Sequence, residues 1–209
     1  MSPSQFDRDS TGFATASQAA GARERPLFVD AESGPGVVCA AMTAPTPPTP
    51  RPAWRATLDE RLPLLGHRNW IVVADSAYPW QASEGIETID TGADHVTVVR
   101  GVLEAIAGSR HVRPVVHLDA ELPFVAEAHA PGITACRQAL AAALGGLATV
   151  SLPHEEIIAL LDEAGRVFRV LLLKTTLALP YTSVFAQLDC AYWSAEAEKA
   201  LRAAIAASR

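Results

Sequence analysis

Short apolar stretches that end at polar side chains constrain this chain most strongly. The first covers residues 70–74 and is followed by Asp75, and a second, within residues 167–174, ends at Lys174. Such stretches are too short to cross a membrane, and their continuous apolar character is typical of strands covered on both faces of a sheet. A buried strand carries the polar groups at its end to the edge of the sheet, where small ligands bind in α/β proteins.

Segments with helical spacing of apolar residues alternate with these strands. We expect strands at residues 70–74, 95–99, 113–118, 148–152, 167–174 and 183–188, and a long polar loop over 76–94. We expect helices at residues 54–65, 102–107, 123–144 (interrupted near 131–132), 154–164 and 194–207, the last capped by Ser194. The alternation predicts an α/β fold: a single three-layer-like domain with a central mixed or parallel sheet flanked by helices.

The first part of the chain has a different composition. Residues 1–52 show no periodic apolar pattern and end in a proline-rich run over 43–52. Closely spaced prolines favour an extended segment that cannot join the interior of a helix or sheet. We therefore expect a disordered extension over residues 1–52 and the folded domain over 53–209.

Charge and composition exclude several classes of partner. The net charge is −6 and no cluster of Lys and Arg occurs, which argues against nucleic acid and against an anionic membrane surface. No apolar stretch reaches the roughly 18 residues of a membrane span. The three cysteines lack the spacing of a disulfide framework or a zinc site, and the first residues lack the pattern of a signal peptide. We expect a cytoplasmic protein.

His67 and Asp75 are the first candidates for chemistry. His67 follows Gly66 and can exchange protons near neutral pH, although a histidine that caps the end of a helix would look the same. Asp75 ends an apolar strand and needs a partner if buried, although an Asx turn would also explain it. Eight residues of straight strand span about 26 Å, so the two side chains meet only if residues 66–69 fold back.

Further candidates follow later strands. His154 begins a helix at the expected ligand-binding edge, or is only a first-turn residue of that helix. Tyr181 can donate to a ligand hydroxyl, or is a half-buried core tyrosine. Lys174 ends a strand and could line the same pocket, or is a polar strand end. The remaining histidines show no ligand spacing and receive no role: His95, His111, His117 and His129.

Three motifs in the same order resemble those of the D-ribose pyranase and L-fucose mutarotase family. The first is Gly66-His67 followed by an apolar strand that ends at Asp75, with the same eight-residue spacing from His to Asp. The second is His154-Glu155 at the start of a helix, and the third is the turn at residues 180–183 after a strand. The resemblance covers about residues 54–193.

The resemblance implies a cofactor-independent mutarotase or pyranase that interconverts anomers or ring forms of a monosaccharide. His67 would be the acid/base and Asp75 its partner, while His154 and Tyr181 would bind sugar hydroxyls. No metal or organic cofactor is implied. Members of the family assemble as pentamers or decamers with sites near subunit boundaries, so a homo-oligomer is expected.

The chain also departs from the family pattern. Ser183 replaces the asparagine that follows Pro-Tyr in the family, and Leu177 replaces a carboxylate. Tyr78 and Trp80 are bulky residues close behind Asp75. The departures motivate two alternatives on the same fold. One is a non-catalytic protein that binds a small ligand, and the other is a diverged isomerase acting on a non-sugar metabolite.

Overall fold

A computed structural model describes residues 52–208, so the expected extension over residues 1–52 lies outside the described residues apart from Pro52. The strands are β1 (Trp70–Ala74), β2 (Ile86–Asp90), β3 (Val112–Asp119), β4 (Thr149–Leu152), β5 (Val170–Lys174) and β6 (Val184–Cys190). The helices are α1 (Ala53–Arg61), α2 (His95–Ala107), α3 (Ile133–Leu144), α4 (His154–Val167) and α5 (Ala195–Ala207), with short 3-10 helices η1 (Leu62–Leu64) and η2 (Leu122–Phe124).

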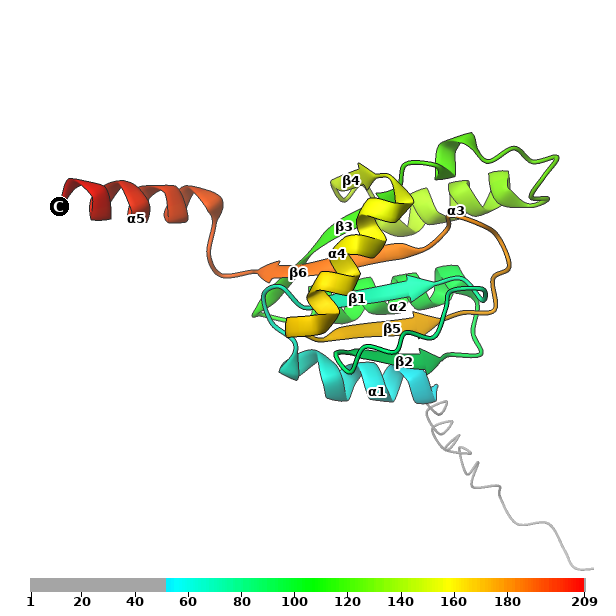
Figure 1. The fold of residues 1–209 in the computed structure, drawn as a ribbon, viewed down its shortest axis with the longest axis horizontal. Coiled ribbons are helices and arrows are strands. Elements are labelled where there is room, and N and C mark those ends of the chain that lie inside the picture. Colours follow the sequence, from blue (N-terminus) through cyan, green and yellow to red (C-terminus); the bar gives the residue numbers. More distant parts are fainter. Residues whose placement is uncertain (1–51, 209) are drawn as a thin grey trace, which may run out of the picture. The chain divides into compact units, whose positions relative to one another are not determined.

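The strands form one mixed sheet in the order β2-β5-β1-β6-β3-β4 (Figure 1). β1 and β2 run parallel to β5, and β3 runs parallel to β4. β6 is antiparallel to both β1 and β3, so β1 to β5 all run in one direction. The carboxyl ends of these five strands therefore lie at the same edge of the sheet as the first residue of β6. The expected mixed α/β fold is confirmed.

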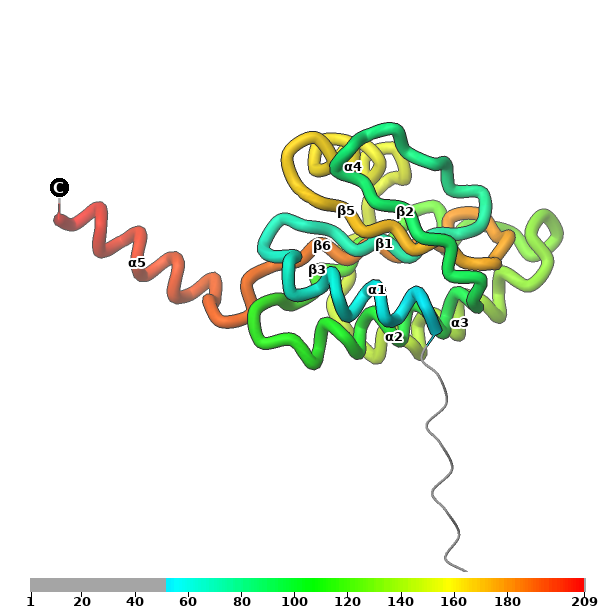
Figure 2. The backbone as a smooth tube through the Cα atoms, turned by 90° about the horizontal axis from the view of Figure 1, so that it is seen from below, coloured from blue at the N-terminus to red at the C-terminus, as the bar shows by residue number. Residues whose placement is uncertain are grey.

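Helices cover both faces of the sheet (Figure 2). α1, α2 and α3 pack with Ile71 and Val73 of β1 in one core, and α4 packs with Trp70 and Val72 in the other. Successive side chains of a strand point to opposite faces, so each residue of β1 enters one of the two cores. This arrangement explains why the stretch over residues 70–74 is continuously apolar.

Three expectations about local structure are wrong. Of the helix expected at residues 123–144, the α-helical part is α3 from Ile133 onward, whereas residues 125–132 form turns after η2. The strand expected at residues 95–99 is the first part of α2, whose N-cap Asp94 accepts a hydrogen bond from the backbone N–H of Thr97 at 2.9 Å. Residues 95–99 are rich in β-branched valine and threonine, yet Val98, Val102 and Ile106 form the buried face of a helix. The loop expected at 76–94 contains β2, which is only partly buried and so lacks a strong apolar signal.

The last helix, α5, begins where the sequence predicts. Ser194 caps it by accepting a hydrogen bond from the backbone N–H of Ala197 at 3.1 Å. None of its described residues is buried, and it extends beyond the end of β6 (Figure 1). Within residues 52–208, no helix combines the length and apolar character that crossing a bilayer requires.

His117 of β3 is a buried histidine whose ring nitrogens have no hydrogen-bond partner among the described residues. Its ring packs edge-on against Trp70, with 5.1 Å between centroids, and burial lowers its pKa. The unfolded chain takes up a proton at this residue near pH 6.5, whereas the folded chain resists protonation until a lower pH. The free energy of unfolding is therefore expected to fall as the pH drops below about 6.5.

A His117→Leu variant tests this expectation, because leucine fills the site without titrating. Urea denaturation above and below about pH 6.5 should show a smaller pH-dependent loss of stability in the variant than in the wild type. Burial also lowers the pKa of His95, so part of the dependence should remain in the variant. Equal pH dependence in the two proteins would contradict the expectation.

Candidate functional site

Polar side chains from four separate parts of the chain gather at the carboxyl edge of the sheet. Asp75 follows β1, Asp119 ends β3 and His154 begins α4 directly after β4, while Tyr181 and Ser183 precede β6. We call these five residues the carboxyl-edge cluster. The direction of the strands brings them to one edge, as the sequence predicts for Asp75 and His154.

Lys174 lies at the same edge, because it ends β5 and pairs in register with Ala74 of β1. Two bulky residues close behind Asp75 motivate the alternative of a non-sugar ligand, because they would make the pocket more apolar. Tyr78 instead packs in the core beneath α4, where burial raises its pKa to about 12, and Trp80 is exposed. The Tyr78 side chain thus contributes to the core.

Asp119 and His154 form a close pair in this cluster. His154 Nδ1 lies 3.0 Å from Asp119 Oδ1, and the Asp119 side chain is fully buried, with 0% exposed. Burial raises the pKa of the Asp119 carboxyl, and the hydrogen bond and charge of His154 oppose that rise. The backbone N–H of His154 makes a separate contact. It donates to both carboxylate oxygens of Glu121, each at 3.1 Å.

Tyr181 also packs against the His154 ring. The two rings meet edge-on, with 5.6 Å between centroids and an interplanar angle of 86°. Tyr181 has a φ of 58°, in the left-handed region that aromatic residues rarely adopt. The turn is closed by the Thr182 hydroxyl, which donates to the carbonyl of Leu179 at 2.9 Å. Backbone conformations of this kind are concentrated at functional sites.

Asp75 combines the two roles that the sequence leaves open. Its Oδ1 accepts from the backbone N–H of Ala77 at 2.8 Å, which is the Asx turn. Its Oδ2 accepts from the Ser183 hydroxyl at 3.3 Å, across 108 residues of sequence. Ser183 is buried, so this contact connects the end of β1 to the start of β6. The carboxylate is thus held in place by both neighbours.

His95 stabilises the carboxyl edge of the sheet through its hydrogen bonds, although the sequence assigns it no role. It is buried, and its Nε2 lies 2.9 Å from the Thr182 carbonyl, while its Nδ1 lies 3.0 Å from the Thr175 hydroxyl. A carbonyl only accepts, so Nε2 carries the hydrogen. Burial lowers the pKa of His95, which favours this neutral ring. His95 therefore fixes the segment that presents Tyr181 and Ser183.

His67 lies at the opposite end of β1 from Asp75. Its Nε2 accepts from Arg68 at 3.1 Å, its Nδ1 lies 3.5 Å from Asp189, and 59% of its side chain is exposed. Residues 66–69 form a tight turn, closed by the Gly66 N–H donating to Asn69 Oδ1 at 2.7 Å, and do not fold back along the strand. Within one chain, His67 and Asp75 therefore form no dyad.

His67 lines a pocket of about 640 Å³ at its own edge of the sheet. The lining includes Arg113, Tyr192 and Trp193, together with Asp189, which accepts from Arg113 Nη2 at 2.7 Å. No sequence signal placed these residues beside the histidine, because they come from β3, from the end of β6 and from the segment between β6 and α5. The pocket shares no lining residue with the carboxyl-edge cluster.

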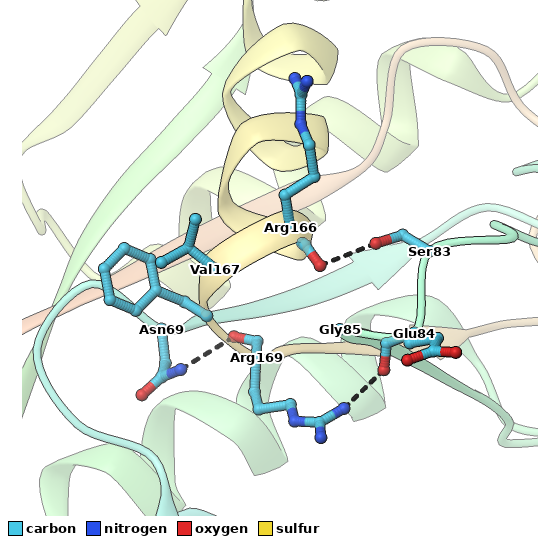
Figure 3. Close-up of a pocket in the computed structure, with 9 residues that line it drawn as sticks. Asn69, Ser83, Glu84, Gly85, Arg166, Val167 and Arg169 are labelled. Carbon is cyan, nitrogen blue, oxygen red and sulfur yellow. Dashed lines mark hydrogen bonds between the residues drawn. The ribbon is translucent and has the colours of Figure 1, made fainter.

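A second pocket at the amino-terminal edge, of about 450 Å³, lies between the end of α4 and the loop before β2 (Figure 3). Its polar groups bond to one another across the gap. Asn69 Nδ2 donates to the Arg169 carbonyl at 3.1 Å, Ser83 donates to the Gly165 carbonyl at 2.7 Å, and Arg169 donates to the Glu84 carbonyl. The contacts of Ser83 and Glu84 join the loop to the end of α4 and the residues after it, and that of Asn69 joins the turn before β1 to the same segment, so we interpret this pocket as a structural junction.

The structure thus defines a mixed α/β protein with a cluster of polar and ionisable side chains at the carboxyl edge of its sheet. Within the described range, no group of three or more His, Cys, Asp or Glu side chains is arranged to hold a metal ion.

No family model and no curated protein matches this sequence. Solved structures similar to the chain include RbsD of Bacillus subtilis complexed with D-ribose, at 22% identity and a TM-score of 0.45, covering 63% of this chain and 90% of that one. FucU of Bifidobacterium longum is 14% identical with a TM-score of 0.41, covering 63% and 92%. The fucose mutarotase of Streptococcus pneumoniae in complex with L-fucose is 17% identical with a TM-score of 0.40, covering 66% and 91%.

Proposed function

We propose that this protein is a cofactor-independent mutarotase or pyranase that interconverts anomers or ring forms of a monosaccharide at the carboxyl-edge cluster. The supporting observation is that His154, Asp75 and Tyr181 come together at one edge of the sheet. An imidazole can exchange protons near neutral pH, and carboxylate and phenol groups can hydrogen-bond to sugar hydroxyls. The cluster therefore contains a group that can exchange protons and groups that can bind sugar hydroxyls.

Ring opening requires one base and one acid. In the proposed reaction, His154 Nε2 takes the proton of the anomeric hydroxyl while the bond from the anomeric carbon to the ring oxygen breaks. The acid delivers a proton to the ring oxygen, which yields the open-chain carbonyl form. Closure on the other face, or through another hydroxyl, returns both protons. Asp75, Tyr181, Ser183 and Lys174 would hold the remaining hydroxyls.

We assign the acid to His67 of a second copy of the chain. His67 is exposed at the far end of β1 and therefore reaches another cluster only across a boundary between subunits. We further propose that the protein forms a homo-oligomer, a pentamer or decamer, and that it acts in the cytoplasm. Asp75 would orient the sugar between the two histidines.

Magnetisation-transfer NMR on ribose and fucose tests the proposed reaction. The wild type should accelerate exchange between anomers or ring forms, and His154→Gln should lower the catalysed rate by about 100-fold or more, the usual contribution of a general base. His129→Gln is the matched control, because this histidine is exposed outside the cluster. Sugar binding without acceleration by the wild type would instead indicate a non-catalytic binding protein.

A further inference from the structure

We infer that Asp119 is a positioning residue for His154: its buried carboxylate holds the ring in the tautomer with hydrogen on Nδ1 and leaves the Nε2 lone pair free for the ligand. The use of Nε2 as a base rests on the proposed function. The tautomer does not, because it depends only on the contact between the two side chains.

The contact between Asp119 and His154 is short, and it uses one of the two carboxylate oxygens. Asp119 Oδ1 lies 3.0 Å from His154 Nδ1, and Oδ2 has no hydrogen-bond partner within residues 52–208. An ionised carboxylate only accepts hydrogen bonds, so the facing nitrogen must carry the hydrogen. In a neutral imidazole the other nitrogen is then the acceptor. Nε2 is therefore the basic atom of His154.

The His154 ring has a second contact besides Asp119. Tyr181 packs edge-on against it, and 30% of the His154 side chain is exposed, which leaves access for a ligand. A ring that hydrogen-bonds to Asp119 and packs against Tyr181 is restricted in its rotation. A catalytic base needs this restriction, because small errors in its position lower the rate strongly.

Asp119 is not needed to start α4. Glu121 already accepts the backbone N–H of His154 with both oxygens, whereas Asp119 contacts only the ring. Burying a carboxylate that makes a single hydrogen bond is costly, and here it brings no helix cap in return. The carboxylate also gives His154 a nearby negative charge, which would stabilise the imidazolium formed after proton uptake. These observations favour a role in orienting the histidine.

The first test is the tautomer of His154 in the wild-type protein. Two-bond ¹⁵N–¹H NMR of a sample labelled in histidine, with His154→Gln to assign the signal, should show the Nδ1–H form for the neutral ring. An Nε2–H form would overturn the inference whatever the activity. This measurement needs neither a substrate nor a variant of Asp119.

The second test is Asp119→Asn, with Asp162→Asn as a matched control. Asp162 lies on the exposed side of α4, so the control makes the same chemical change on the helix that carries His154. An asparagine can accept from Nδ1 or donate to it, and should therefore give mixed tautomers. We expect kcat to fall by about 10- to 100-fold, the range seen when the carboxylate that orients a metal-binding histidine is replaced. KM should change little, because Asp119 does not touch the sugar.

The two tests together distinguish a failure of the positioning role of Asp119 from a failure of the proposed sugar reaction. An Asp119→Asn protein that keeps the wild-type melting temperature, shows mixed tautomers and loses kcat supports the positioning role. An Asp119→Asn protein that keeps both the single tautomer and its kcat overturns it. If the wild type shows the Nδ1–H form but acts on no sugar, the proposed function is wrong while the role of Asp119 in orienting His154 is upheld.

Discussion

Two inactive variants, His67→Ala and His154→Gln, are expected to regain activity when they are produced together. Each substitution removes one of the two proposed proton-transferring groups, so each alone should lose about 100-fold or more in rate. Within one chain, His67 lies at the opposite end of β1 from the carboxyl-edge cluster. If each site combines His67 of one copy with His154 of another, mixed oligomers contain some sites in which both histidines are intact.

Co-expression of the two variants with different affinity tags, followed by purification on both tags, isolates the mixed oligomers for magnetisation-transfer NMR. The control replaces His154→Gln with the double variant His67→Ala/His154→Gln, which supplies no intact His67 and should restore nothing. Full activity of His67→Ala alone would show that His67 has no part in the reaction. Its contacts with Arg68 and Asp189 would then be its only assigned role.

Among the glycines of residues 52–208, Gly85 is the one at which substitution by alanine is expected to cause the largest loss of stability. A Cβ at Gly85 would lie 2.0 Å from the Gly165 carbonyl oxygen and 2.6 Å from that of Phe168. Both are backbone atoms at the end of α4, and the Gly85 carbonyl is itself held by the Val170 N–H at 2.9 Å. The backbone must therefore move, and overpacking of this kind costs about 3 kcal/mol in the free energy of unfolding.

Urea denaturation of a graded series tests this expectation. A Cβ at Gly165 would meet the Ile86 side chain at 2.7 Å, which can rotate, so Gly165→Ala should cost less than Gly85→Ala. A Cβ at Gly108 would have its nearest contacts at 3.5 Å, and Gly108→Ala should be nearly neutral. A Gly85→Ala protein as stable as Gly108→Ala would contradict the prediction. It would show that the backbone at the junction between α4 and the loop before β2 shifts to accommodate the added Cβ at little cost in stability.

The sequence predicts part of the candidate site because strand ends carry a recognisable signal. An apolar stretch that stops at a polar residue predicts the edge position of Asp75 and Lys174, and the same signal at the end of β3 could have identified Asp119. His95 has no such signal. Its role depends on Thr175 and Thr182, which lie about 80 residues later in the chain and reach it only through the fold.

The sequence alone determined the fold class, the apolar strands β1 and β5 and the start of α5. These features depend on local patterns, such as the burial of both faces of a strand or a serine cap. The tertiary structure decided which residues meet. β1 pairs with β5, aligning Trp70 with Val170, and β6 lies between β1 and β3. Such contacts between distant segments depend on how the whole core packs, so they placed Asp119 beside His154 and Ser183 beside Asp75.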